Sequence, residues 1–130
     1  MTETEMKLRT KRFALHLLRL TAAMPRTIAA DVLHRQVVRS GTAVASGYRA
    51  ACRAKSSADF IYKLSVVEEE ADETALWLEL IAEDGMLPQG KVAALLQEAG
   101  EITAMMVSAQ KTVRVSRLPH NPKSKLQNPK

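Results

Sequence analysis

The chain has 130 residues, of which 46% are hydrophobic and 25% charged, and its formal net charge is +5 at pH 7. This length suits one domain with a single hydrophobic core, and this balance excludes a chain that is disordered throughout. The only cysteine, Cys52, excludes an intramolecular disulfide, so nothing demands an oxidising compartment. No apolar run approaches the roughly 18–20 residues of a membrane span, and the opening MTETEMKLRTKR lacks the apolar core of a secretion signal. We therefore expect a cytoplasmic protein that has no membrane partner.

Apolar residues recur at helical spacing in four long segments that proline and glycine separate. The third segment has the most regular repeat, because its apolar residues lie alternately four and three apart, as in helix bundles and coiled coils. No alternating apolar run bounded by hairpin turns indicates a strand. Helices are therefore expected over residues 6–24, 28–54, 57–84 and 90–116.

The residues between these segments are typical of helix ends. Pro25 ends the first helix, because proline lacks the amide hydrogen and disfavours helix in the residue before it. Thr27 is a suitable N-cap for the second helix, and the sequence SSAD at 56–59 predicts a capping box for the third. Gly85 is expected at the C-terminus of the third helix, and Pro88 just before the fourth.

Short connections between consecutive long helices imply antiparallel neighbours. The predicted fold is all-α: an antiparallel up-down-up-down four-helix bundle over residues 1–118. The remaining segment, PHNPKSKLQNPK at 119–130, has no apolar periodicity, and we expect it to be a disordered basic tail.

The helices carry more apolar residues than one core stripe uses. The expected core stripe of the third helix is Phe60, Leu64, Val67, Ala71, Thr74, Leu78 and Ile81, and that of the fourth is Leu95, Ala99, Ile102, Met106, Ala109 and Val113. A lone bundle would expose part of the surplus, which predicts a protein–protein interface and a homo-oligomer. The surplus residues are Leu8, Leu15, Leu18, Ile61, Val66, Leu76 and Leu80.

Charge divides the middle of the chain into a basic helix and an acidic one. Residues 56–90 carry nine acids against Lys63 alone, whereas the second helix carries a basic and hydroxylic row. The row repeats alternately four and three residues apart, so it follows one helix face for about 27 Å. Guanidinium groups in such a row can bind successive phosphates. Its members are Arg35, Arg39, Thr42, Ser46, Arg49 and Arg53.

Two interpretations of this row stay open. Arg35 and Arg39 are expected to be structural, paired with acids of the third helix or of another subunit; the candidate acids are Glu68, Asp72, Glu79 and Glu83. Arg49 and Arg53 are instead expected to lie exposed with Lys55 at the corner between the second and third helices. These three residues, with Lys123 and Lys125 of the tail, are the predicted nucleic-acid-binding residues.

Catalysis is not indicated. A di-iron bundle needs two Glu-x-x-His pairs, and the only acid three residues before a histidine is Asp31, before His34. Cys52 is a lone thiol for which no base is indicated, and no phosphate-binding glycine loop or nucleophile elbow occurs. We therefore predict no catalytic residues, no metal site and no cofactor.

Residues 35–80 contain the strings RQVVRSGT, RAKSSADFIYKL and EADETALWLEL. They resemble the bacterial four-helix-bundle family of the 23S rRNA intervening-sequence proteins and, more distantly, the accessory variability proteins of diversity-generating retroelements. The chain departs from the family at Gly47 and Ala50, where Asn and Glu are usual. The matching positions are Arg35, Gln36, Arg39, Ser40, Gly41, Arg53, Ala54, Lys55, Ser56, Asp59, Phe60, Lys63, Leu64, Glu70, Glu73, Trp77 and Leu78.

The resemblance implies a four-helix bundle that assembles into a ring, commonly a pentamer. It places Arg35, Arg39, Glu70 and Glu73 among structural or interface ion pairs. One functional hypothesis is a non-catalytic assembly that binds RNA or DNA through phosphate contacts, as an accessory to a structured RNA or to a reverse transcriptase. The other is a structural or protein-binding oligomer whose basic and acidic helices pair with each other.

Overall fold

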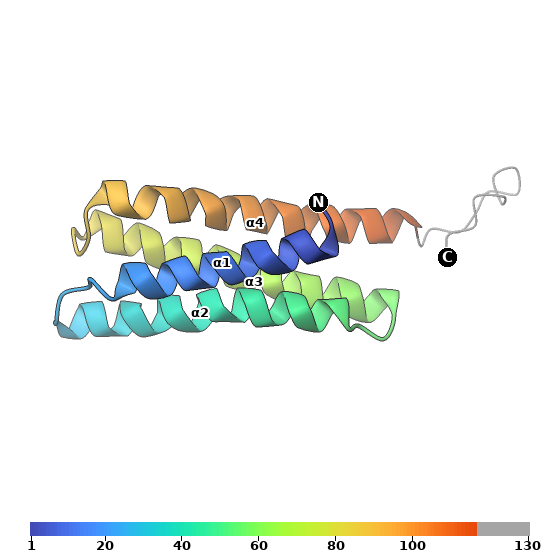
Figure 1. Cartoon of the computed structure of the whole chain (residues 1–130), viewed down its shortest axis with the longest axis horizontal. Helices are drawn as coiled ribbons and strands as arrows, with labels where there is room; N and C mark the ends of the chain where they lie inside the picture. Colours follow the sequence, from blue (N-terminus) through green and yellow to red (C-terminus); the bar gives the residue numbers. More distant parts are fainter. Residues whose placement is uncertain (117–130) are drawn as a thin grey trace, which may run out of the picture.

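The computed structural model describes residues 1–116, which form four long helices lying side by side along one axis (Figure 1). Each helix runs antiparallel to the next, so the predicted all-α, up-down-up-down bundle is confirmed. The predicted tail at 119–130 lies outside the described residues. The helices are α1 (Glu3–Thr21), α2 (Ile28–Cys52), α3 (Ser57–Glu83) and α4 (Gln89–Ser116).

Helix α1 begins at Glu3 rather than at the predicted residue 6. The Thr2 hydroxyl accepts a hydrogen bond from the Glu5 amide (3.1 Å), and the Glu5 carboxylate accepts one from the Thr2 amide (2.7 Å). These bonds form a capping box, and they hold the pKa of Glu5 below its usual value. The sequence TETE at 2–5 carries this signal, which the apolar pattern alone does not show. At its other end α1 stops at Thr21, before the predicted residue 24.

The next two helix starts are capped largely as predicted. The Thr27 hydroxyl accepts from the Ala30 amide at 3.1 Å, and the Ser56 hydroxyl accepts from the Asp59 amide at 3.0 Å. The predicted capping box at 56–59 differs in one bond, since the Asp59 carboxylate accepts from the amide of Lys55, at 3.1 Å, and not from that of Ser56. A carboxylate in the first turn also interacts favourably with the helix dipole.

Gly85 ends α3 as predicted, in the left-handed conformation with φ 77°. The Met86 amide donates to the carbonyl of Ile81 and the Gly85 amide to that of Ala82, which together form a Schellman motif. A side chain at position 85 would strain this conformation, so glycine here makes the sharp turn into α4 possible.

Helix α3 supplies the centre of the core. Its buried stripe begins at Ile61, and Phe60, predicted as a core residue, is only half-buried. On α4, Val92 is buried as well, while Leu95 and Ala109 of the predicted stripe are half-buried and pack against the core, and Val113 is half-buried outside the core cluster. A straight helix has 3.6 residues per turn, so a strict seven-residue repeat drifts off the buried face over a long helix. The buried residues of α3 are Ile61, Leu64, Val67, Ala71, Thr74, Leu78 and Ile81.

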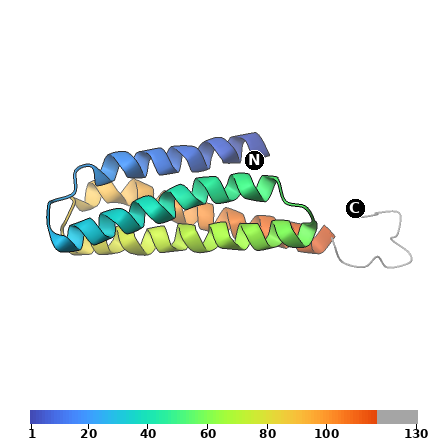
Figure 2. The ribbon, with the colours of Figure 1, turned by 90° about the horizontal axis from the view of Figure 1, so that it is seen from below.

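Helix α1 lies at one edge of the bundle and α3 at the opposite edge (Figure 2). Helix α2 packs along both, α4 packs mainly on α3, and the contact between α1 and α4 is small; no Cα atom of α1 lies within 8 Å of one of α3. Consequently α1 buries one narrow stripe and leaves Leu8, Leu15 and Leu18 at 44%, 40% and 43% exposure. These three residues are part of the apolar surplus that the sequence indicated.

The close approach of α1 to α2 depends on Gly41. A Cβ atom at this position would overlap Cδ1 of Leu17, and the Leu17 side chain is only 1% exposed, so it has little room to move. Gly100, in the interior of α4, has nothing within 4 Å of an added Cβ.

We predict opposite effects of alanine at these two glycines. Gly100→Ala should raise the free energy of unfolding by up to about 1 kcal/mol, because alanine has the higher helix propensity. Gly41→Ala should lower it, because the cost of overpacking a core, about 1–3 kcal/mol, exceeds that gain. Urea unfolding followed by circular dichroism measures both changes, and equal stabilisation by the two substitutions would contradict the packing assigned to Gly41.

Candidate nucleic-acid interface

The corner between α2 and α3 presents three cations to solvent. Arg49, Arg53 and Lys55 are all exposed, and none of them forms an ion pair within residues 1–116. The Arg53 Nη1 donates to the backbone carbonyl of Arg49 at 3.3 Å, at the C-terminal end of α2, where the helix dipole favours positive charge. The nearest acid in the first turn of α3, Asp59, is paired with Lys63 at 2.8 Å, which lowers the pKa of Asp59. The three cations therefore keep their charge available to an outside anion.

The last turns of α4 extend this positive surface. Helix α4 ends at the same end of the bundle as the α2–α3 corner (Figure 1). Val113 and Ser116 of α4 line one surface hollow together with Lys55. Lys111 and Arg114 are exposed on these same turns and also form no ion pair with the rest of residues 1–116. The predicted tail residues Lys123 and Lys125 lie outside the described residues. We call Arg49, Arg53, Lys55, Lys111 and Arg114 the basic end.

The middle of the α2 row is neutralised. The Arg39 guanidinium bridges two acids of α3: its Nη1 lies 3.2 Å from Glu70 and its Nη2 lies 2.5 Å from Glu73. Burial opposes the charge on Arg39, but these two carboxylates outweigh it and raise the Arg39 pKa. Among the other predicted acids, Glu68 instead accepts a hydrogen bond from Gln110 of α4 at 2.8 Å. Arg35 is exposed and, within the described part of the chain, has no ion-pair partner. The row therefore does not act as one continuous positive track.

Helix α1 has a second basic row that the sequence reasoning missed. Arg9, Arg12, His16 and Arg19 recur three, four and three residues apart, which is the signal that would have revealed it. Arg9 is held by two acids of α4: its Nε lies 2.6 Å and its Nη2 2.7 Å from Glu98, and its Nη2 lies 2.5 Å from Glu101. This pairing, chiefly with Glu98, raises the pKa of Arg9. Arg9 is therefore a structural link between α1 and α4.

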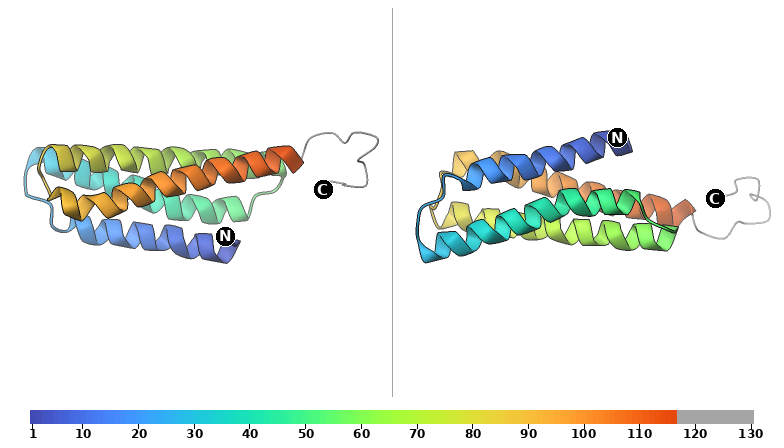
Figure 3. Two further views of the ribbon diagram at one scale, coloured as in Figure 1. Left: turned by 90° about the horizontal axis from the view of Figure 1, so that it is seen from above. Right: turned by 60° about the horizontal axis from the view of Figure 1, so that its bottom comes forward.

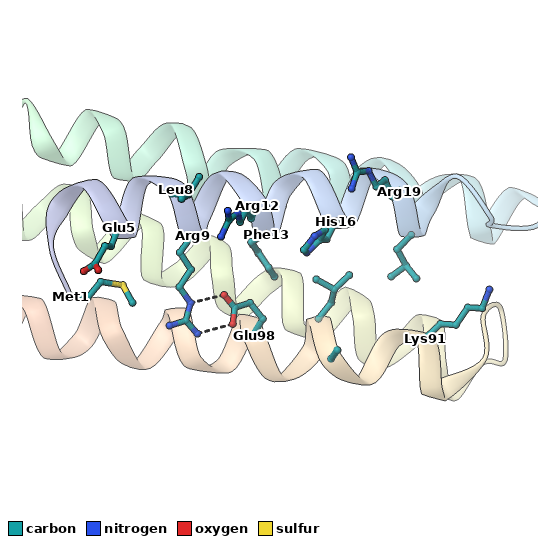
Figure 4. Close-up of a pocket in the computed structure, with 13 residues that line it drawn as sticks. Met1, Glu5, Leu8, Arg9, Arg12, Phe13, His16, Arg19, Lys91 and Glu98 are labelled. Carbon is teal, nitrogen blue, oxygen red and sulfur yellow. Dashed lines mark hydrogen bonds and ion pairs between the residues drawn. The ribbon is translucent and has the colours of Figure 1, made fainter.

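The rest of this row borders a groove of about 880 Å³ between α1 and α4 (Figure 4). Its wall includes the apolar side chains of Leu8, Phe13, Leu20 and Leu95. Its cationic lining, apart from Arg9, consists of Arg12, His16, Arg19 and Lys91. The groove exists because α1 and α4 are in close contact over only a small area.

The cysteine has no features of a nucleophile. Cys52 is half-buried near Tyr48, and burial raises the pKa of its thiol, so the thiolate is disfavoured at neutral pH. In residues 1–116 no group of three or more His, Cys, Asp or Glu side chains is placed to bind a metal ion. Within the same residues, no helix is long and apolar enough to cross a membrane.

The fold places the chain in a class of small all-helical proteins built as one four-helix bundle, here with exposed cations grouped at one end. Residues 2–108 match the family described as 23S rRNA-intervening sequence protein. The chain belongs to this family, as the resemblance predicted.

A solved structure supports the same assignment. The chain is similar to a crystal structure of a protein with unknown function from the S23 ribosomal protein family of Bacteroides thetaiotaomicron. The two are 30% identical with a TM-score of 0.76, over 82% of this chain and 98% of that one. No curated protein matches the sequence.

We predict that Arg9→Gln loosens α1 from the bundle. The substitution leaves Glu98 and Glu101 without their cation, and hydrogen bonds to charged groups contribute about 1.5–3 kcal/mol when well shielded. Because the Arg9 side chain is 25% exposed, we expect a loss toward the lower end of that range. Arg35→Gln is the matched control, since its exposed side chain has no ion-pair partner among the described residues. Thermal melts of both variants provide the measurement, and equal melting temperatures would contradict the structural role of Arg9.

Proposed function

We propose that this protein is a non-catalytic, homo-oligomeric RNA-binding protein that holds phosphates at its basic end. The observation that carries the proposal is the group of exposed cations at one end of the bundle, none of which pairs with an acid of residues 1–116. Arg9 and Arg39 are neutralised by acids of neighbouring helices, whereas the five cations grouped at this end are left to solvent. Unpaired surface cations attract a polyanion over distances comparable to the Debye length.

The proposed contacts are to the backbone rather than to bases. Only five aromatic residues occur in the chain; near the basic end Tyr48 is buried and Phe60 is half-buried, which leaves Tyr62, 66% exposed, as the one aromatic side chain there that is open to stacking on a splayed base. Arginine and lysine contacts to phosphate tolerate many sequences and weaken steeply with salt. Lys123 and Lys125, just beyond α4 in sequence, would add to the same positive surface.

RNA is the nucleic acid that we favour over DNA, and the family's name is the support for this choice. The proposed role is that of an accessory protein for a structured RNA. A reverse transcriptase is the protein partner that the more distant part of the resemblance implies.

One observation favours the alternative hypothesis of a structural protein. The Arg39 bridge to Glu70 and Glu73 shows that the basic and acidic helices do pair within one chain. In that hypothesis the exposed charges serve only protein–protein contacts. The two hypotheses differ in whether cations at the basic end bind RNA more strongly than equal charges elsewhere on the surface.

We predict that Arg49→Gln/Arg53→Gln/Lys55→Gln weakens RNA binding and lowers the slope of log K against log salt by about two to three, because each lost phosphate contact removes roughly 0.7–0.9 from the slope. Fluorescence anisotropy with a labelled structured RNA at several salt concentrations measures both effects. Folding should persist, because exposed charges contribute little to stability.

The matched control is Arg26→Gln/Arg35→Gln/Lys91→Gln, which removes the same charge from the opposite end of the bundle. A variant that ends at residue 118 measures the share of the tail lysines. If the two triple variants lose affinity equally, the site assignment is wrong. If the unmodified protein shows no salt-sensitive RNA binding, the hypothesis of a structural protein replaces that of an RNA-binding protein.

We also predict a homo-oligomer, because the exposed leucines of α1 and α3 are the apolar surface of an interface rather than of a monomer. Multi-angle light scattering should give a multiple of 14.3 kDa, about five times in the pentamer that the resemblance implies. A 14.3 kDa species at micromolar concentration would contradict this prediction.

A further inference from the structure

Helix α1 presents a continuous apolar and basic surface on its outer side. Leu8, Lys11, Leu15, Leu18 and Ala22 recur three and four residues apart and are all exposed, so they form one outward stripe. Arg12 and Arg19 lie beside it. The sequence contains no acidic residue between Glu5 and Asp31, and Lys11, Arg12 and Arg19 form no ion pair within residues 1–116. We call Leu8, Lys11, Arg12, Leu15, Leu18 and Arg19 the α1 face.

Helix α3 presents the complementary surface. Glu69, Asp72, Leu76, Glu79 and Glu83 follow the same spacing of three and four, and Leu80 lies next to them. All six are exposed, the leucines at 46% and 41%. No Lys or Arg occurs between Lys63 and Lys91, and no basic residue lies in the last turn of α3. We call these six residues the α3 face.

The acids of the α3 face lie where their own helix disfavours them. The C-terminal end of a helix carries partial negative charge, and cations are the stabilising residues there. Glu79 and Glu83 lie in the last turns of α3, and neither forms an ion pair within residues 1–116. A cationic surface supplied from outside the chain would relieve this repulsion.

The two faces cannot meet within one chain. Helices α1 and α3 are not neighbours in the bundle, and they form its opposite edges (Figures 2 and 3). A second copy of the chain can present the missing surface to each of them. Such a contact joins two different faces, so it is heterologous and can continue from copy to copy.

The leucines of the two faces lie towards the same end of the bundle. Helices α1 and α3 run in the same direction and end at the same end of the molecule (Figure 1). Leu18 lies three residues before Thr21, the last residue of α1, and Leu80 lies three residues before Glu83, the last residue of α3. At 1.5 Å per residue, Leu18 and Leu80 each lie about 4.5 Å from the last residue of their helix, so parallel copies set side by side would bring the leucines of the two faces near each other. A heterologous contact closes into a ring if its rotation closes and forms a filament if it does not.

We propose that the α1 face of each copy docks on the α3 face of the next copy. Leu15 and Leu18 pack against Leu76 and Leu80, while Lys11, Arg12 and Arg19 neutralise Glu69, Asp72, Glu79 and Glu83 across the contact. This inference rests on the homo-oligomer of the proposed function and names its two surfaces. It leaves the basic end outside the contact, so assembly and RNA binding are separable properties.

Substitution of the leucines tests the apolar part of the contact. Leu15→Glu/Leu18→Glu should reduce the light-scattering mass to 14.3 kDa at micromolar concentration. The control is Ile28→Glu, because Ile28 is 86% exposed and lies outside both faces, and it should keep the oligomer. Circular dichroism must show helical spectra for both. An oligomer that persists in the double variant would overturn the inference.

Charge reversal tests the pairing, and it includes a rescue that a misfolded variant could not show. Lys11→Glu/Arg19→Glu and Asp72→Lys/Glu83→Lys should each dissociate the oligomer, and all four substitutions in one chain should restore it. Dissociation by Arg26→Glu/Arg35→Glu, which reverses charges outside both faces, would count against a specific contact. Failure of the four-fold variant to reassemble would overturn the charge pairing.

Cross-linking tests the heterologous geometry directly. In a Cys52→Ser background, Leu18→Cys and Leu80→Cys chains should cross-link with a short bismaleimide when mixed and not when each is alone. Cross-linking of either variant by itself would indicate a two-fold contact and would overturn the inference. If the unmodified protein assembles but does not bind RNA, only the RNA-binding part of the proposed function is wrong. If the unmodified protein is a monomer, this inference and the proposed homo-oligomer are wrong, whereas RNA binding is unaffected.

Discussion

Burial of the apolar stripe of α3 is the interaction on which the rest of the structure depends. Helix α3 is the one helix against which both α2 and α4 pack along their length, and its buried residues include Leu64, Val67, Leu78 and Ile81. A buried hydrogen bond of 2.7 Å between Ser40 and Thr74 crosses the contact between α2 and α3. Since a buried hydroxyl without a partner costs free energy, this pair favours one register of α2 on α3 over its alternatives.

Helix α1 is held differently from the other three. Its close packing on α2 depends on the missing side chain at Gly41, and its link to α4 depends on Arg9 between Glu98 and Glu101. Because this attachment is narrow, α1 keeps an outer side rich in leucine and cations, and a groove remains between α1 and α4. The surfaces available for partners therefore follow from how little of α1 the bundle buries.

The charge pattern along the chain becomes a pattern in space once the helices are placed. In the basic row on α2, Arg39 is neutralised by α3, whereas Arg49 and Arg53 form no ion pair within residues 1–116 and lie at the end where α4 also terminates. Exposed acids of α3 and exposed cations of α1 lie on helices that form opposite edges of the bundle. A single chain thus leaves opposite charges on opposite edges, an arrangement suited to contact between copies and distinct from the RNA surface proposed at the basic end.

The sequence by itself determined the fold class, the number and order of the helices and most of their boundaries. These properties follow from local signals, namely apolar periodicity and the capping residues Thr27, Ser56 and Gly85, which act within a few residues of each other. The start of α1 was also readable from Thr2 and Glu5, although apolar periodicity does not report it.

Only the tertiary structure decided which charges are paired. The sequence narrowed the partners of Arg39 to acids of the third helix, but the bridge to both Glu70 and Glu73 depends on the rotation and register of α3 against α2. Arg9 meets Glu98 and Glu101 about ninety residues away in sequence, and no local pattern encodes that distance. Helix formation depends on residues that are close in sequence, so the helices were predictable. Side-chain pairs between helices depend on how two whole helices are oriented against each other, so the candidate site was predictable only in part.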